Sequence, residues 1–194
     1  MSKQYEQRSS TEKLTVEERQ EGSDKLTING YAAVFNSLSH DLGGFRERID
    51  PAAFNEVLEN DVRAAFNHDP SMILGRTSAG TLRLSIDDTG LRYEVDLPNS
   101  TMGRDLYESV QRGDIAESSF KFTVLDDEWR DTEEGVIRTI KQVGRLIDVA
   151  PVSFPAYPDA TVAARSLEQW KETVITDDDE KRLQLLRVDL ESRI

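Results

Sequence analysis

The strongest constraint on the fold is an alternation of apolar and polar side chains along Ile115–Val124. Successive side chains of a β-strand point to opposite faces, so this alternation places Phe120 and Phe122 on one face and Ser119 on the other. Ser118 falls on the apolar face. We therefore predict a half-buried strand in which Ser119 lies on a polar, reachable face. An ordinary amphipathic strand with two incidental serines explains the same pattern.

Similar patterns divide the rest of the chain into strands and a few helices. Further strands are predicted at residues 25–35, 45–49, 62–67, 82–86, 91–97, 136–140 and 144–154, with a hairpin turn at residues 87–90 and an acidic loop at residues 126–135. Helices are predicted from Asp50-Pro51 to Leu58, from Met102 to Arg112, and from Val162 to Val174. Mostly antiparallel strands with few helices indicate an α+β fold, as a barrel or a sandwich.

The composition limits the kind of partner that the chain can have. The chain of 194 residues has 37 acidic and 24 basic residues, a formal net charge of -13, and no cysteine. Such a surface repels nucleic acid and anionic membranes, and the lack of cysteine excludes disulfides and thiolate metal sites. No apolar run approaches the roughly 20 residues of a membrane span, and no signal peptide is evident, so we expect a soluble, intracellular protein.

The residues that can carry chemistry are few. His40 lies in a loop sequence rich in serine, aspartate and glycine, where a solvated side chain is expected, and His68 ends a predicted strand. No spacing of metal ligands and no phosphate-binding loop is found, so no cofactor or metal is predicted. A serine nucleophile needs a base and an acid that orients the base, and His68, Ser119 and Asp148 supply these residue types. A purely structural role for His68 remains open.

Three groups of residues, in this order, resemble the prohead maturation proteases of tailed bacteriophages. They are Asn67-His68-Asp69-Pro70 with Leu74-Gly75-Arg76, then Ser119-Phe120 with Phe122, then Leu146-Ile147-Asp148-Val149 with Val152 to Pro158. Upstream residues 30–36 and 47–54 fit as well, so the resemblance covers residues 25 to 165. It implies a β-barrel surrounded by helices, related to the herpesvirus assembly protease.

The resemblance also implies roles for residues of this chain. His68 matches the general base, Ser119 the nucleophile and Asp148 the acidic residue of the family. Lys121 stands where the family usually has glycine, and Asp148 is one methylene shorter than the usual glutamate. We expect Lys121 to point to solvent. Arg76 and Arg145 are considered as oxyanion donors, together with backbone amides.

The implied function is a prohead serine endopeptidase, acting inside the immature shell in the host cytoplasm. It would cleave the scaffolding part of the major capsid protein, and also itself. The expected domain organisation is a flexible segment at residues 1–22, a protease domain at residues 23–165, and a helical, acidic tail at residues 166–194. We expect the apolar stripe beyond Asp179 to dock on a partner and to be trimmed on activation.

Two other interpretations remain at this point. A catalytically inactive internal scaffold protein with the same fold would also account for Lys121 and Asp148. A soluble α+β binding module unrelated to phage is the third. The relation to the herpesvirus enzyme suggests a homo-oligomer, by analogy of fold alone.

Overall fold

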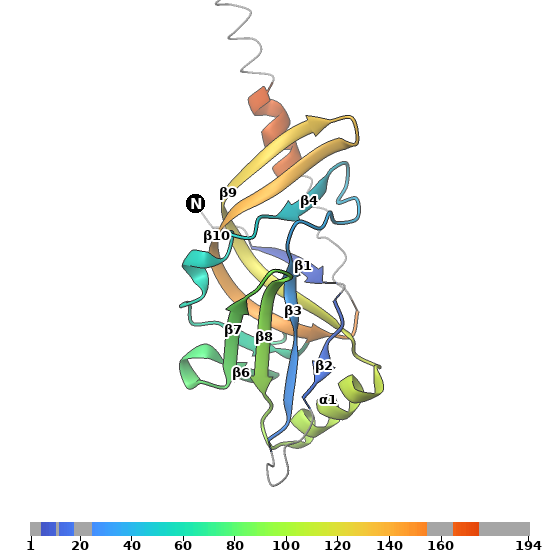
Figure 1. The fold of residues 1–194 in the computed structure, drawn as a ribbon, viewed down its shortest axis with the longest axis vertical. Coiled ribbons are helices and arrows are strands. Elements are labelled where there is room, and N and C mark those ends of the chain that lie inside the picture. The colour runs from blue at the N-terminus through green and yellow to red at the C-terminus, as the bar shows by residue number, and fades with distance from the viewer. Residues whose placement is uncertain (1–4, 11, 18–24, 155–164, 175–194) are drawn as a thin grey trace, which may run out of the picture.

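The computed structural model describes residues 5–10, 12–17, 25–154 and 165–174. The chain forms two β-sheets with one α-helix at the end of the smaller sheet (Figure 1). The larger sheet has the order β1-β9-β10-β5-β6, with β4 also paired to β10, and the smaller sheet has the order β2-β3-β8-β7. The bounds of the larger sheet's strands are Glu6–Ser10 for β1, Arg46–Ile49 for β4, Arg63–Ala65 for β5, Ile73–Arg76 for β6, Glu117–Thr132 for β9 and Gly135–Val152 for β10. Those of the smaller sheet are Thr15–Val16 for β2, Thr27–Val34 for β3, Leu82–Ile86 for β7 and Gly90–Asp96 for β8.

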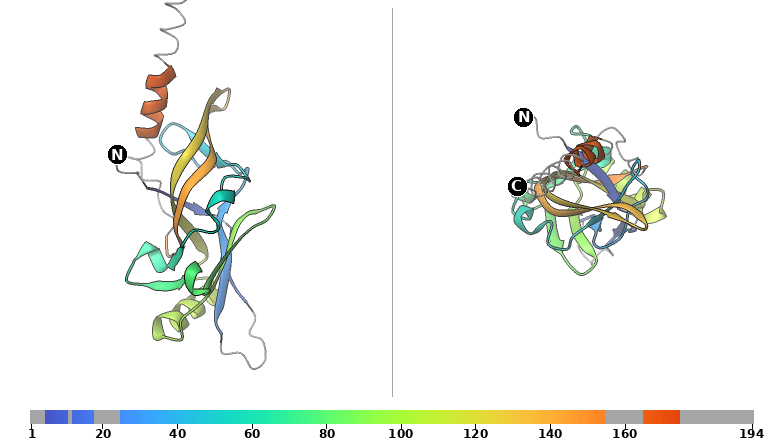
Figure 2. Two further views of the ribbon diagram at one scale, coloured as in Figure 1. Left: turned by 90° about the vertical axis from the view of Figure 1, so that its left-hand side faces the viewer. Right: turned by 90° about the horizontal axis from the view of Figure 1, so that it is seen from above.

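The hairpin of β9 and β10 is the longest element, and it forms the centre of the larger sheet. The end of this hairpin at which β9 turns into β10 extends away from the smaller sheet, as Figure 2 shows in two further views. Repeated register shifts between the two strands mark β-bulges, which bend long strands. The strand predicted at Ile115–Val124 is the first half of β9. The predicted acidic loop at residues 126–135 is wrong up to Thr132, because cross-strand pairing with β10 continues to that residue.

The hydrophobic core lies between the two sheets. Phe120 and Phe122 stack on each other with ring centroids 4.7 Å apart, and Phe54 packs edge-on against Phe120. Tyr93 from β8 reaches the same core and is fully buried. The apolar face predicted for β9 is thus the face that joins the larger sheet to the smaller one.

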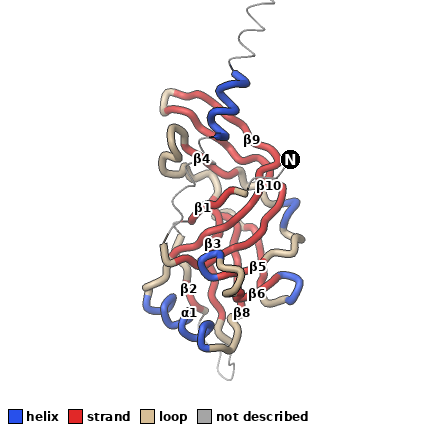
Figure 3. Tube along the Cα trace, turned by 180° about the vertical axis from the view of Figure 1, so that it is seen from behind, coloured by secondary structure: helices blue, strands red, loops and turns tan. Residues whose placement is uncertain are grey.

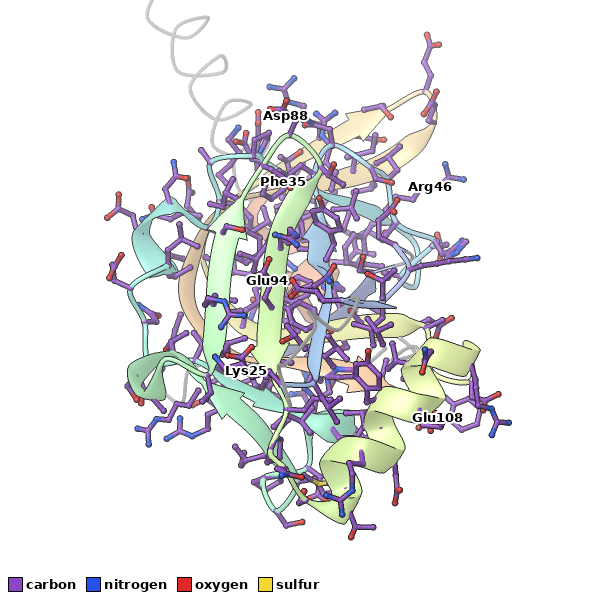
Figure 4. The ribbon with its side chains drawn as sticks, turned by 60° about the horizontal axis from the view of Figure 1, so that its bottom comes forward. Lys25, Phe35, Arg46, Asp88, Glu94 and Glu108 are labelled. Carbon is purple, nitrogen blue, oxygen red and sulfur yellow. The ribbon has the colours of Figure 1, made fainter. Side chains whose placement is uncertain are left out.

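Helix α1, Thr101–Arg112, follows its predicted bounds closely. The Ser100 hydroxyl accepts a hydrogen bond from the Gly103 amide at its start, and Gly113 ends it in the left-handed conformation, with φ of 82°. Leu106 and Val110 face the core, whereas Glu108 lies on the exposed face, as Figure 4 shows.

Several other predicted elements differ from the structure. The helix predicted from Asp50 is only a series of turns around the 3-10 helix η1, Asn55–Val57, although Phe54 and Val57 are buried as expected. The flexible segment expected at residues 1–22 is wrong for the residues of β1 and β2, since both strands pair into sheets. Figure 3 shows the strands and helices from behind. The β-barrel expected from the resemblance is not found, because the strands of the described residues form two sheets and no closed barrel.

Beyond the sheets, residues 165–174 are helical, within the helix predicted for residues 162–174. Trp170 stacks on Trp129 of β9 at a centroid distance of 5.6 Å, and Leu167 is buried with Leu42 and Phe45. The acidic run at residues 177–180 and the apolar stripe beyond it lie outside the described residues. No helix among the described residues is long and apolar enough to cross a membrane.

Candidate active site

The three predicted site residues come from three different elements of the larger sheet. Ser119 lies near the start of β9, and Asp148 lies near the end of β10. His68 ends the 3-10 helix η2, Phe66–His68, which directly follows β5. Since β5 pairs with β10 in parallel and Asp148 lies opposite Arg63, the end of β5 carries His68 toward β10.

His68 joins the other two side chains in one hydrogen-bonded row. Its Nδ1 lies 2.6 Å from Oδ1 of Asp148, and its Nε2 lies 2.8 Å from Oγ of Ser119. Nearly all of this row is shielded from water, because the side chains of His68 and Asp148 are only 7% and 12% exposed. A row of hydroxyl, imidazole and carboxylate is the arrangement that activates a serine for attack on a carbonyl.

The backbone at His68 is in an uncommon conformation. Both Asn67 and His68 have positive φ, 53° and 58°, which residues other than glycine rarely adopt. The Asn67 side chain holds this turn, because its Oδ1 accepts a hydrogen bond from the Ser153 amide at 2.9 Å. Such conformations are often found at functional sites. Asn67 belongs to the motif around His68, but nothing in the sequence pattern assigns it a role.

The two serines of β9 have different environments, as the alternation predicts. Ser118 faces the core, where its Oγ lies 2.8 Å from the hydroxyl of Tyr93. Ser119 faces His68 instead. The expectation that Ser119 is reachable is wrong, since it is 0% exposed. The reason is that β1 pairs with β9 along this stretch, with Ser9 directly opposite Ser119.

The N-terminal strand β1 also brings charged side chains into a buried ion-pair cluster. Arg8 donates hydrogen bonds to both carboxylate oxygens of Glu47, at 2.8 and 2.9 Å. Arg138 donates to both carboxylate oxygens of Glu6, at 2.8 and 3.0 Å, and contacts Glu47 and Asp127 as well. Sequence reasoning did not find this cluster, and its only trace is the alternation of charged residues at positions 6 and 8.

The charges of this cluster stabilise one another. Burial alone would raise the pKa of Glu6, but the hydrogen bonds and charges of Arg138 and Arg8 outweigh it and hold that pKa below its ordinary 4.5. Burial would lower the pKa of Arg138, but its hydrogen bond to Glu6 and the charge of Glu47 raise it. Both shifts favour the charged forms of Glu6 and Arg138.

Of the remaining residues singled out from the sequence, Lys121 lies next to the hydrogen-bonded row, and the others lie away from it. His40 lines a pocket of about 340 Å³ beside β1 and is separate from the hydrogen-bonded row. Arg76 pairs with Asp61 on the surface, and Arg145 is exposed. Lys121 is partly buried, opposite both Gln7 of β1 and Asp148 of β10. Within the described ranges, no group of three His, Asp or Glu side chains is placed to hold a metal ion.

Comparison with known proteins agrees with the resemblance seen in the sequence. A family model described as caudovirus prohead serine protease matches residues 12–173, which include His68, Ser119 and Asp148. No curated protein and no solved structure matches the chain significantly. The family match covers most of the 194 residues. The chain belongs to the prohead serine protease family of tailed bacteriophages.

Proposed function

We propose that the protein is a capsid maturation endopeptidase that uses Ser119 as nucleophile, His68 as general base and Asp148 as the orienting acid. The observation that carries this proposal is the row of hydrogen bonds from Asp148 through His68 to Ser119. The Asp148 carboxylate accepts a hydrogen bond from Nδ1–H of His68. In the neutral imidazole with its proton on Nδ1, Nε2 has no proton and can accept that of the Ser119 hydroxyl.

The reaction is acyl transfer in two steps. Ser119 Oγ attacks the peptide carbonyl carbon while its proton moves to His68 Nε2. The C–N bond then breaks, and His68 gives the proton to the leaving amine, which produces an acyl-enzyme. A water molecule, losing a proton to His68, then attacks the ester carbon. The bond from this carbon to Ser119 Oγ breaks, and His68 returns the proton to Oγ, which restores the serine. The Asp148 carboxylate stabilises the imidazolium in both steps.

The substrate that we propose is the scaffolding part of the major capsid protein, cleaved inside the immature prohead in the host cell. Cleavage of the protein's own chain is part of the same proposal. The net charge of -13 supports this location, because an acidic protein does not bind the DNA that is packaged into the shell.

A second candidate function is an inactive internal scaffold protein. The observation that favours it is the complete burial of Ser119 beneath β1. Lys121 and the short acid Asp148 are also compatible with a degraded site.

Co-expression with the capsid protein separates the two functions. Capsid processing should occur with the wild type and with Ser118→Ala, and should disappear with Ser119→Ala. Ser118→Ala is the matched control, since it removes a neighbouring hydroxyl from the opposite face of the same strand. Unchanged processing with Ser119→Ala would exclude Ser119 as nucleophile. Assembly without processing in every sample would favour the scaffold function.

A further inference from the structure

The strand β1 covers the candidate nucleophile. It pairs antiparallel with β9 from Glu6 opposite Phe122 to Ser10 opposite Ser118. The carbonyl oxygen of Arg8 accepts a hydrogen bond of 2.8 Å from the Ser119 hydroxyl. A backbone carbonyl of the protein itself thus lies against the oxygen that would attack a substrate carbonyl.

This contact opposes catalysis. A hydroxyl has only one proton to donate. The Oγ of Ser119 lies 2.8 Å from the carbonyl oxygen of Arg8 and also 2.8 Å from Nε2 of His68. While that proton is donated to Arg8, it is not donated to the imidazole that must remove it. The hydroxyl also points at the carbonyl oxygen, whereas attack requires it to approach the carbonyl carbon. With β1 in place, Ser119 is held in an unreactive state.

The side chains of β1 fit two oppositely charged positions on the body of the protein. Glu47 binds the Arg8 guanidinium with two hydrogen bonds, and the same guanidinium lies over the ring of Phe122. Arg138 binds the Glu6 carboxylate in the same two-point manner. Glu47 and Arg138 also contact each other, at 3.0 Å, so they remain paired if β1 leaves.

The position of β1 in the chain is consistent with a strand that can detach from β9. It ends before residue 12, where the family match begins, so the matched part of the chain does not include this cover on β9. The pocket of about 340 Å³ borders β1 along Arg8 to Ser10, so the space left by β1 would join it as one groove. An uncovered strand edge is a common binding site for an extended peptide.

We propose that β1 occupies the site where the substrate peptide binds, and that its side chains reveal the substrate's chemistry. This proposal rests on the function proposed above. The substrate segment lies antiparallel to β9, with an acidic side chain at Arg138, a basic side chain two residues later at Glu47, and the carbonyl of that basic residue at Ser119. Cleavage then follows the basic residue. Glu47 and Arg138 set the specificity, and β1 must withdraw before a substrate binds.

Alkylation of a cysteine at position 119 tests the cover without requiring catalysis. Ser119→Cys introduces the one cysteine of the chain, which iodoacetamide modifies wherever it is accessible. In the full-length protein, adding Ser9→Pro and Ser10→Pro should accelerate alkylation at least tenfold, because one of two adjacent prolines must remove an amide that β1 uses for pairing. Equal rates with and without the prolines would overturn the proposal.

A gentler variant guards against loss of folding in the proline variant. Glu6→Gln removes the charge that anchors β1 to Arg138, while Arg138 keeps Glu47 and Asp127. It should also accelerate alkylation of the Ser119→Cys protein, by a smaller factor, with a cooperative thermal transition retained. No acceleration in a folded Glu6→Gln protein would count against β1 as a displaceable strand.

The specificity is tested by adding back the strand as a synthetic peptide with the sequence of residues 5–10. In the proline variant of the Ser119→Cys protein, this peptide should slow alkylation of the introduced thiol again. Peptides with glutamine in place of the glutamate or the arginine should protect at least about tenfold less well, the loss expected from one charged contact. Equal protection by all three peptides would overturn the proposed specificity. Since only the peptide is varied, differences in protection cannot come from misfolding of the protein.

Two outcomes separate this proposal from the proposed function. The first outcome concerns the Ser9→Pro, Ser10→Pro protein, from which β1 is displaced. If the peptide protects its Ser119→Cys form, but the same proline variant with Ser119 intact neither reacts with a fluorophosphonate nor cleaves the peptide after its arginine, the binding site is retained and the protease function is lost. A protein that processes capsid protein at sites without a preceding basic residue, and that the peptide does not protect, would remain a protease and lose the proposed specificity.

Discussion

The imidazole of His68 and the carboxylate of Asp148, 80 residues apart in the chain, lie 2.6 Å from each other. Parallel pairing of β5 with β10 brings them together, since Asp148 lies opposite Arg63 and His68 follows β5 within a few residues. An aspartate is one methylene shorter than a glutamate, but the strand pairing places Asp148 within hydrogen-bond distance of His68. The short acid is thus no obstacle to the proposed role of Asp148.

We predict that Asp148→Asn lowers the reaction of Ser119 with a fluorophosphonate by roughly 10⁴-fold, as loss of the orienting acid does in other serine proteases. Both proteins are compared with Ser9→Pro and Ser10→Pro added, so that β1 does not cover Ser119. The amide keeps the shape of the side chain but stabilises the wrong tautomer of His68. Intact-mass measurement of the labelled protein gives the rate. The control is Gln7→Pro, which alters β1 but none of the three site residues, so this protein should label at least as fast as the wild type. An unchanged rate in Asp148→Asn would rule out the role of Asp148.

We predict that Asn67→Ala lowers the free energy of unfolding by about 1–3 kcal/mol. Alanine is strained at a φ of 53° and cannot accept the hydrogen bond of the Ser153 amide. Asn67→Asp should lose less, because aspartate tolerates the left-handed conformation and keeps the acceptor oxygen. Urea denaturation measures both variants, and equal losses would show that neither the backbone conformation nor the acceptor matters.

The pair of Ser118 and Tyr93 should be coupled in stability but not in catalysis. Ser118→Ala leaves the buried Tyr93 hydroxyl without its partner, at a cost of about 1–3 kcal/mol. Tyr93→Phe alone has a similar effect, but the double variant should cost less than the sum, since both polar groups are then gone. Urea denaturation of the four proteins tests this, and strict additivity would contradict a direct hydrogen bond.

Glu6 should make stability depend on pH in a defined direction. Its pKa in the folded protein lies below 4.5, so the folded state favours the charged form. The stabilisation is therefore complete above the unfolded pKa and is lost as pH falls through the folded one. The wild type should exceed Glu6→Gln in unfolding free energy at pH 7, and the difference should shrink below about pH 5.

The control for this prediction is Glu108→Gln, which removes the same charge from the exposed face of α1 (Figure 4). Thermal melts between about pH 3 and pH 7 should show no comparable change in its difference from the wild type. A pH-independent difference for Glu6→Gln would mean that the ion pairs of Glu6 do not stabilise the folded state.

Elements defined by short-range patterns were predicted well from the sequence. The hairpin of β7 and β8 follows the turn at residues 87–90, and α1 lies between a serine cap and Gly113. The helix predicted after Asp50 is wrong, because burial of Phe54 and Val57 needs only a turn there. The acidic residues 126–132 join a strand because pairing with β10 satisfies their backbone, which charge composition does not reveal.

Along β9, the order of residues was enough to establish which way each side chain faces. The alternation separates Ser119 from Ser118 because the period of a strand is two, whatever the strand pairs with. Which side chains meet depended on the folded arrangement of the strands. The contact of His68 with Asp148 depends on strand pairing across 80 residues, and the burial of Ser119 depends on β1, whose polar sequence resembles that of a free terminus. Long-range pairing of backbone groups leaves little trace in local sequence, because any residue except proline can supply them.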